Sequence, residues 1–399
     1  MGKIIFITEY FAPAQTTTGF YLTKIIEKAA SFCDNNIEVC CATVSEVGDS
    51  EKYKFKITRY DFDWLDKNKL FQRLIKFFLM TLRFSWFAFR HIKQDSVVFM
   101  VTNPPPVLLF LGLLRKFRRF KYILLIYDVF PENLIAAKLS TKRSLMYRLA
   151  LKCFNWAYRA ADQLIGIGRD NAEVIAQKVG SNNNISVITN WADTEAVYPI
   201  RKSDNPIIKK YNLENKTVFL FAGNLGRLQG IEMLLEAALN VKDKNFQLVF
   251  IGSGVLRDKI QKYIALNPNG NVLWAGEFSI SEQLTFLNAC DVGVVSLDNE
   301  MYGLGVPSKS YYYMAAGKPI LFVGDKRSEI ARVIQEEDIG WIVEPGDVLL
   351  LAQTIDNVCL SLKKYIADKG DRARDTVVRR FSQKIVLEQY SKLFSRVTR

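Results

Sequence analysis

The stretch Phe219-Leu-Phe-Ala-Gly-Asn-Leu-Gly-Arg-Leu-Gln-Gly230 carries an apolar strand pattern into a glycine-rich turn, and a helical pattern follows over residues 231–239. Glycine lets the backbone approach a ligand closely, and unpaired N–H groups at a helix start attract anions. Arg227 adds a positive charge at the same turn. The stretch therefore predicts one strand–turn–helix unit of an α/β fold with a phosphate site, and a purely structural turn is the alternative.

The same alternation of short apolar strands and helical patterns continues on both sides of this stretch. Strands separated by helices predict parallel βαβ units. We expect strands at residues 3–8, 39–44, 97–101, 122–127, 163–167, 185–188, 218–222, 247–251, 272–274, 292–295, 320–323 and 340–343. The predicted fold is α/β, with two Rossmann-like doubly wound domains that face each other across a cleft.

The length of 399 residues exceeds what one hydrophobic core usually supports and fits two domains. The composition, 49% apolar and 24% charged, excludes a disordered or low-complexity chain. A polar stretch at 201–210 is a candidate linker. We predict an N-terminal domain at 1–195, a C-terminal domain at 196–383, and an amphipathic helix at 384–399 that packs back on the N-terminal domain.

Cysteine and histidine usage narrows the chemistry. The six cysteines form no CxxC pair, which indicates buried thiols in a reducing compartment. His91 is the only histidine, so a Ser-His-Asp or Cys-His triad is excluded unless His91 serves in it, and a histidine-ligated zinc site is not expected. The first apolar run reads as a strand because it is too short for a signal peptide, so we expect a cytoplasmic protein.

The chain carries 54 Lys and Arg against 41 Asp and Glu, a net charge of +13. Residues 67–121 alone hold 12 basic residues and one acid, Asp95. A helix over the first part of this segment has a narrow basic stripe beside a wide aromatic face, which an interfacial membrane helix needs. The predicted membrane contacts are Lys69, Arg73, Lys76, Phe78, Arg83, Trp86, Phe87, Arg90, Arg115, Lys116, Arg118 and Arg119.

Two other interpretations of the basic segment exist. One is a buried helix whose cations form its solvated face, and the other is a nucleic-acid surface. The nucleic-acid interpretation is disfavoured, since the aromatic residues form a continuous apolar face and do not alternate with polar groups. Charges within the helix and the prolines at 104–106 argue against a membrane span. We therefore predict a peripheral contact with the anionic inner face of the cell membrane, and no nucleic-acid partner.

A third motif predicts a helix that Ser308 caps and that begins near Lys309. This motif is Gly303-Leu-Gly-Val-Pro-Ser-Lys-Ser-Tyr-Tyr-Tyr-Met-Ala-Ala-Gly-Lys-Pro-Ile320. Cations at two separate turns, Arg227 and Lys309, are predicted to hold one diphosphate. Ile251-Gly-Ser-Gly254 adds a second glycine turn, which is a weak signal by itself.

Together, Ala222-Gly-Asn-Leu-Gly-Arg-Leu-Gln-Gly230, Gly252-Ser-Gly254 and the third motif resemble the GT-B-fold glycosyltransferases of family 4, most closely the bacterial O-antigen, capsule and exopolysaccharide branch. The N-terminal half agrees with this resemblance. The matching segments there are Glu9-Tyr-Phe-Ala-Pro13 with Gly19, Thr102-Asn-Pro-Pro105, Tyr127-Asp-Val-Phe-Pro-Glu132 and Thr189-Asn-Trp-Ala-Asp193.

The resemblance implies retaining, metal-independent transfer of a hexosyl or N-acetylhexosaminyl group from a nucleotide sugar, UDP-linked, without a cofactor. The C-terminal domain would bind the donor, and the N-terminal domain a lipid-linked or saccharide acceptor. It implies a catalytic role for Asp128 as proton acceptor and for Arg227 and Lys309 at the leaving diphosphate. The implied donor-binding residues are Gly19, Gly223, Asn224, Gly226, Arg227, Gln229, Gly252, Pro307, Ser308, Lys309 and Tyr312.

The chain departs from the family pattern at two places. Family members often carry two glutamates eight residues apart, and the matching positions here are Leu304 and Tyr312. Tyr312 keeps a hydroxyl for a ribose but no charge. Two alternatives therefore stay open: a UDP-sugar epimerase of similar fold, and a non-catalytic GT-B subunit of a membrane glycosyltransferase complex.

Overall fold

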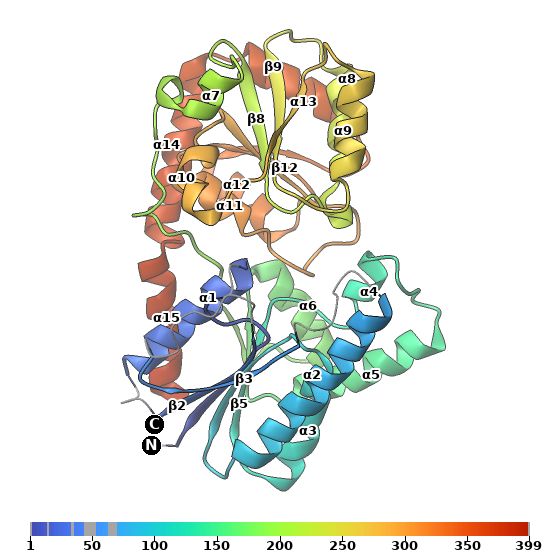
Figure 1. Ribbon diagram of the computed structural model, residues 1–399, viewed down its shortest axis with the longest axis vertical. Helices are drawn as coiled ribbons and strands as arrows, with labels where there is room; N and C mark the ends of the chain where they lie inside the picture. The colour runs from blue at the N-terminus through green and yellow to red at the C-terminus, as the bar shows by residue number, and fades with distance from the viewer. Residues whose placement is uncertain (1, 14–15, 33–35, 44–52, 63–69, 398–399) are drawn as a thin grey trace. The chain divides into compact units, whose positions relative to one another are not determined.

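The computed structural model describes residues 2–13, 16–32, 36–43, 53–62 and 70–397. The chain divides into two compact units: unit 1 is Met1–Thr189 with Leu387–Arg399, and unit 2 is Asn190–Val386. These boundaries lie close to the predicted ones at 195/196 and 383/384. The first half of the chain is blue to green and the second green to red (Figure 1).

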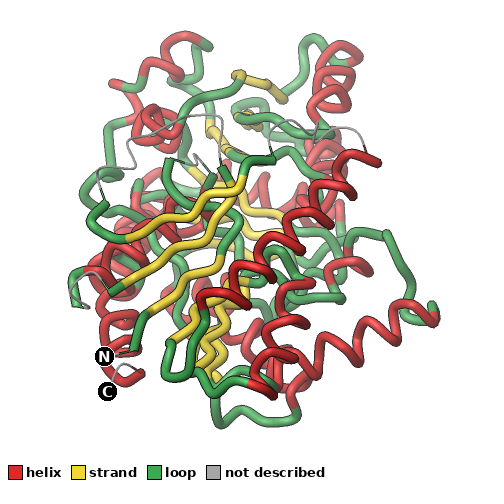
Figure 2. Tube along the Cα trace, turned by 60° about the horizontal axis from the view of Figure 1, so that its bottom comes forward, coloured by secondary structure: helices red, strands yellow, loops and turns green. Residues whose placement is uncertain are grey.

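Unit 1 is built on a seven-stranded parallel sheet of order β3-β2-β1-β4-β5-β6-β7. Most of these strands are continuous apolar runs, as expected where helices cover both faces of a sheet. Figure 2 shows the strands side by side in yellow, with red helices around them. The strands are β1 (Ile4–Ile7), β2 (Ile37–Ala42), β3 (Lys56–Tyr60), β4 (Val97–Val101), β5 (Lys121–Ile126), β6 (Gln163–Gly166) and β7 (Ile185–Val187).

Helices cover both faces of this sheet (Figure 1). On one side lie α1 (Thr17–Ala30) and α15 (Gln383–Val397), and the Phe394 ring of α15 packs 6.0 Å from Phe6 of β1. On the other side lie α2, α3 and α5. Their bounds, with those of the shorter connecting helices, are α2 (Leu70–His91), α3 (Pro106–Phe117), α4 (Asn133–Ala136), α5 (Leu145–Arg159) and α6 (Arg169–Val179).

Unit 2 repeats this plan with six parallel strands of order β10-β9-β8-β11-β12-β13. The strand order reverses beside β8, and the carboxyl end of such a strand is where open α/β sheets bind ligands. The strands are β8 (Thr217–Ala222), β9 (Phe246–Ile251), β10 (Val272–Gly276), β11 (Val292–Ser296), β12 (Ile320–Val323) and β13 (Gly340–Val343).

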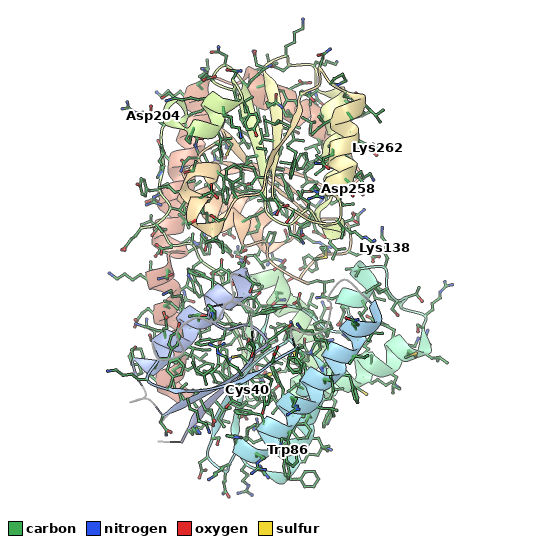
Figure 3. All side chains as sticks on the ribbon, viewed as in Figure 1. Cys40, Trp86, Lys138, Asp204, Asp258 and Lys262 are labelled. Carbon is green, nitrogen blue, oxygen red and sulfur yellow. The ribbon has the colours of Figure 1, made fainter. Side chains whose placement is uncertain are left out.

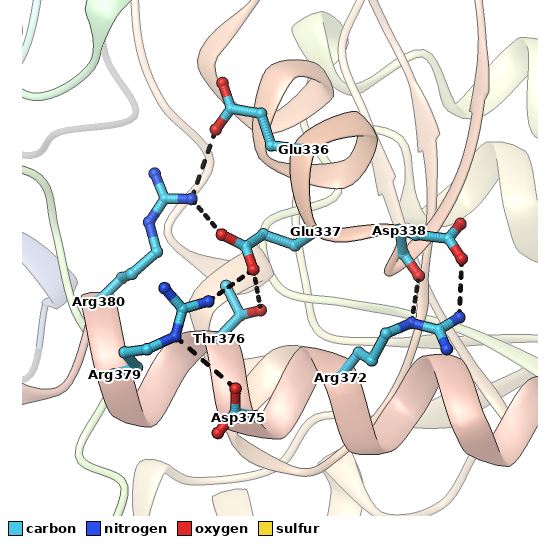
Figure 4. A network of polar contacts seen from close by, with 8 residues as sticks. All are labelled: Glu336, Glu337, Asp338, Arg372, Asp375, Thr376, Arg379 and Arg380. Carbon is cyan, nitrogen blue, oxygen red and sulfur yellow. Dashed lines mark hydrogen bonds and ion pairs between the residues drawn. The ribbon is translucent and has the colours of Figure 1, made fainter.

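The helices of unit 2 are α7 (Pro206–Lys210), α8 (Ile231–Asn240), α9 (Arg257–Leu266), α10 (Gln283–Leu287), α11 (Lys309–Ala315), α12 (Glu329–Glu337), α13 (Val348–Leu360) and α14 (Lys363–Arg380). An ion-pair network joins α12 to α14 (Figure 4). In it, Arg380 contacts Glu337 at 2.6 Å and Arg379 contacts the same carboxylate at 2.7 Å. The shared carboxylate stays ionised, because the two guanidinium groups hold the pKa of Glu337 below its usual value.

Candidate functional site

The loop between β8 and α8 carries the first predicted glycine turn. Gly223 leaves β8 with a φ of +130°, which side-chain-bearing residues rarely adopt. Leu225 is fully buried and anchors the loop, whereas Asn224 and Arg227 are exposed. Arg227 to Gln229 then form a single 3-10 turn, which leads into the first turn of α8. The loop thus presents polar side chains at the carboxyl end of β8.

The second glycine turn lies directly against the first. Gly252, at the end of β9, has a φ of +120°, and a Cβ atom there would come within 2.1 Å of the Gly223 carbonyl oxygen. Hydrogen bonds from Gly223 N–H to the Ile251 carbonyl (2.9 Å) and from Leu225 N–H to the Ser253 carbonyl (2.8 Å) join the two turns. The weak sequence signal at Gly252 therefore marks a residue that shapes the loop.

Lys309, at the start of α11, completes the site. Its ammonium nitrogen lies 3.6 Å from the centre of the Phe221 ring and donates a hydrogen bond to Gln229 Oε1 at 3.1 Å. A Cβ atom at Gly223 would lie 3.7 Å from Lys309 Nζ. Burial lowers the pKa of Lys309 to about 7, from an ordinary value of 10.5. A lysine in such a setting gains most from an arriving anion, which restores its charged form.

The structure brings together Gly223, Gln229, Gly252 and Lys309, and it places Arg227 two residues from Gln229 in the same turn. Gly226 begins that turn, and Pro307 and Ser308 lead into α11. Ser308 does not cap α11 as predicted, because its own backbone is helical and its side chain makes no cap hydrogen bond. Instead the Ser310 hydroxyl donates to the Pro307 carbonyl at 2.6 Å.

Tyr313 is a positioning residue that the sequence analysis missed. Its buried hydroxyl donates to the Leu220 carbonyl at 2.6 Å and accepts from the Ala222 N–H at 2.8 Å, so it fastens α11 to the end of β8. Gly293 makes room for the ring, since a Cβ atom there would lie 2.3 Å from it. Its neighbour Tyr312, the predicted ribose contact, is itself largely buried.

Two of the predicted site residues, Gly19 and Asp128, belong to unit 1. Gly19 lies in the first turn of α1, where its N–H is taken by the Thr16 hydroxyl at 3.0 Å. Asp128 follows β5 and accepts a hydrogen bond from the Asn133 side chain at 3.0 Å. Burial raises the pKa of Asp128, which makes it a better proton acceptor than an ordinary aspartate.

Glu9, which follows β1, is a second carboxylate candidate at the same edge of the unit 1 sheet. Asn103, after β4, donates a hydrogen bond to it. Burial raises the pKa of Glu9, while hydrogen bonds from Tyr10 and Asn103 and the charge of Lys76 oppose that rise. Burial raises the pKa of Tyr10, and the negative charges of Glu9 and Asp128 add to that rise, so both carboxylates lie close enough to Tyr10 to affect it. The sequence signal that could have identified Glu9 is its position after the first strand, because the carboxyl ends of parallel strands meet at one edge of the sheet.

The exposed face of α2 carries part of the predicted membrane surface. Phe78 and Trp86, the latter labelled in Figure 3, are exposed, and so are Arg83 and Arg90. Phe87 is the exception, because it is buried and stacks on the His91 ring at 4.3 Å between ring centres. The prediction that Phe87 contacts a membrane is therefore wrong: the aromatic residues of α2 divide between a buried and an exposed face.

The cations at the end of α3 also divide. Arg115 pairs with Asp162, and Arg118 donates to the Ile92 carbonyl at 2.8 Å beyond the end of α2. Lys116 and Arg119 remain exposed. Lys76 is half-buried, Lys69 lies outside the described residues, and so does the side chain of Arg73. No helix in the described part of the chain combines the length and apolar character needed to cross a membrane.

Comparison with known proteins bears on this geometry. Residues 216–360, which contain both glycine turns and α11, match the family model "Glycosyl transferases group 1". Over 391 residues the chain is 36% identical to "Probable glycosyltransferase WbjE" of Pseudomonas aeruginosa, covering 98% of this chain and 97% of that protein.

Solved structures bear on the fold. Anabaena HepE in complex with UDP superposes with a TM-score of 0.71 at 17% identity, covering 99% of this chain and all of that chain. WaaG, a glycosyltransferase involved in lipopolysaccharide biosynthesis, gives 0.68 at 12% identity, covering 98% of this chain and 99% of that one. The predicted fold, two Rossmann-like domains of the GT-B type, is confirmed.

Proposed function

Because this chain belongs to the glycosyltransferase group 1 family, we propose that it moves a sugar from a UDP-linked donor to a lipid-linked or saccharide acceptor in cell-surface polysaccharide synthesis. The observation that carries the proposal is Lys309, a half-buried lysine whose ammonium group lies between an aromatic ring and Gln229 at a glycine turn. The positive charge of Lys309 favours a ligand with concentrated negative charge, such as a nucleoside diphosphate.

The chemistry follows from charge development. When the bond between the sugar and the diphosphate breaks, negative charge grows on the leaving phosphate oxygen. Lys309 and Arg227 stabilise that charge without a metal ion, and a fixed cation in a dry site does so without reorganising solvent. The acceptor hydroxyl loses its proton either to the leaving oxygen on the same face, in a retaining transfer, or to Asp128, whose raised pKa suits that task.

The donor class has independent support. HepE, which shares this fold, was solved with UDP and with UDP-glucose. A UDP-linked hexosyl or N-acetylhexosaminyl donor, and membership of the family 4 polysaccharide branch, are parts of the proposal.

The acceptor explains the surface of unit 1. A lipid-linked acceptor lies at a membrane, and the exposed face of α2 offers Phe78 and Trp86 beside Arg83 and Arg90. Aromatic rings sink into the headgroup boundary while cations meet anionic lipids. We therefore place the protein on the inner face of the cell membrane as a peripheral enzyme.

The test is a screen of nucleotide sugars for hydrolysis and transfer by the purified full-length chain. A UDP-sugar should release UDP, and Arg227→Ala and Lys309→Ala should each lower the rate by about 10²-fold or more. An epimerised sugar without transfer would favour an epimerase instead. No turnover with any donor, or near-wild-type rates for both variants, would overturn the proposal.

A further inference from the structure

The beginning of α5 exposes apolar side chains that unit 1 leaves uncovered. Leu145 and Met146 are 81% and 83% exposed, the highest values for large apolar side chains among the described residues, and Leu149 is 65% exposed. Of the first five residues of α5, only Tyr147 is buried. Figures 1 and 2 both show this end of α5 extending away from the sheet of unit 1. An exposed apolar surface of this kind is typical of an interaction site.

The same segment is strongly basic. No acidic residue occurs between Glu132 and Asp162. Five exposed cations lie in the same segment of the chain, and the first of them, Lys138, is labelled in Figure 3: Lys138, Lys142, Arg143, Arg148 and Lys152. A surface with this charge is complementary to an anionic partner.

The spacing along α5 places its apolar and its basic side chains on different parts of the helix surface. Leu145 and Leu149 are one turn apart and Met146 lies beside them, so the three form one apolar face. Arg148 and Lys152 flank this face on one side, at the same helical spacing. An apolar face edged by long cationic side chains suits the boundary between lipid headgroups and acyl chains, where the cations reach the phosphates.

Helices α2, α3 and α5 lie on the same side of the unit 1 sheet (Figure 1). α3 lies between α2 and α5 and contacts both. Lys116 of α3 lies 5.3 Å from the ring of Trp156 in α5, and Gly112 lets that ring come close. On α3 itself Phe117 is 79% exposed, and Leu113 is exposed too. Exposed apolar residues thus occur on three neighbouring helices of the same side of unit 1.

We propose that the first two turns of α5, with the loop that precedes them, insert into an anionic lipid bilayer as a second membrane contact separate from α2. The identity of the partner rests on the membrane contact of the proposed function. Leu145, Met146 and Leu149 supply the apolar insertion, while the five surrounding cations bind lipid phosphates.

The test is flotation of the full-length chain with vesicles of phosphatidylcholine, with and without phosphatidylglycerol. The triple variant Leu145→Ser, Met146→Ser, Leu149→Ser should bind the phosphatidylglycerol vesicles about tenfold or more weakly than wild type, because three apolar side chains no longer enter the boundary. The matched control, Leu360→Ser with Leu362→Ser, removes leucines of similar exposure from unit 2 and should bind like wild type.

A second pair, Phe78→Ser with Trp86→Ser, separates this inference from the α2 contact. If that pair loses binding and the triple variant does not, the α2 contact stands and the role of α5 is overturned. An unchanged far-UV circular dichroism spectrum and urea midpoint show that the triple variant is folded, since UDP binding would report on unit 2 alone. If wild type ignores both kinds of vesicle but forms a dimer that the triple variant abolishes, α5 is a protein interface and the proposal fails.

Discussion

At the scale of single residues, Lys309 combines two properties that usually exclude each other. Its ammonium group is far enough inside the protein for burial to lower its pKa to about 7, yet it stands at the mouth of the glycine loop beside Gln229. Burial penalises the charged form, and an anion at the loop would remove that penalty. The binding of an anion is therefore coupled to the protonation of Lys309.

This coupling predicts the pH dependence of UDP binding. Above pH 7 the free site has a neutral Lys309, whereas the complex holds it charged, so binding takes up a proton and the affinity falls as the pH rises, by up to about tenfold per pH unit. The terminal phosphate of UDP does not cause this change, because it has already ionised, with a pKa of about 6. Titration calorimetry between about pH 7.5 and 9.5 measures it. Lys309→Arg stays charged throughout and should show a flat profile; a wild-type affinity that is constant or rises would contradict the coupling.

At the scale of elements, the two glycine turns form a single structural piece. The predicted consequence concerns Gly252→Ala, which places a methyl group 2.1 Å from the Gly223 carbonyl and also strains a φ of +120°. Gly276→Ala is its control, since Gly276 has a φ of +104° but nothing within 4 Å of an added Cβ. Both variants carry the backbone strain, and Gly252→Ala adds an overlap that costs about 1–3 kcal/mol more. Urea unfolding measures this difference; equal losses would mean that the close approach is absent.

Tyr313 makes a prediction of the same kind for α11. Tyr313→Phe leaves the Leu220 carbonyl and the Ala222 N–H without their buried partner, so the free energy of unfolding should fall by about 1–3 kcal/mol and UDP binding should weaken. Tyr122→Phe is the matched control, because the Tyr122 hydroxyl is buried without a hydrogen-bond partner among the described residues. Chemical denaturation of both variants tests this, and a Tyr313→Phe variant as stable as Tyr122→Phe would refute it.

The sequence predicts the positions of helices and strands better than the directions in which their side chains point. Every strand expected from an apolar run is present, whereas the edge strand β3 was missed because Lys56–Tyr60 alternates with polar residues and is only partly buried. The three consecutive tyrosines of α11 are equivalent as a pattern, and only packing selects Tyr313 to reach β8. Phe87 was misassigned for the same reason, since a helix that is apolar almost all round does not reveal its buried face.

At the scale of the whole molecule, the excess of basic residues behind the net charge of +13 lies in more than one segment of the chain. Residues 67–121 hold one basic segment, and α5 with the loop before it belongs to a second, whose basic residues are spread among neutral ones. Within 67–121, Arg115 and Arg118 have partners inside unit 1, which only the folded chain reveals. The two glycine turns were predictable because their glycines are local signals, whereas Glu9 and Asn103 meet only through the order of the strands.

The distribution of charge predicts a salt dependence. Binding of the full-length chain to vesicles that contain phosphatidylglycerol should fall steeply between low and physiological ionic strength, because exposed cations are screened over a Debye length of about 8–10 Å. Because apolar insertion does not depend on charge, a fraction of the vesicle binding should remain at high salt. Sedimentation with vesicles across a salt series measures both parts. Binding that does not respond to salt would contradict the role of the cations.

The central claim, that the glycine turns and Lys309 hold the diphosphate of a nucleotide sugar, is tested most directly by calorimetry with UDP and UMP. Wild type should bind UDP about tenfold or more tightly than UMP, because the second phosphate meets the Lys309 cation. Lys309→Met, which keeps an unbranched side chain of similar length without the charge, should bind the two nucleotides alike. Wild type that binds neither nucleotide, or a Lys309→Met variant that still prefers UDP, would contradict the account.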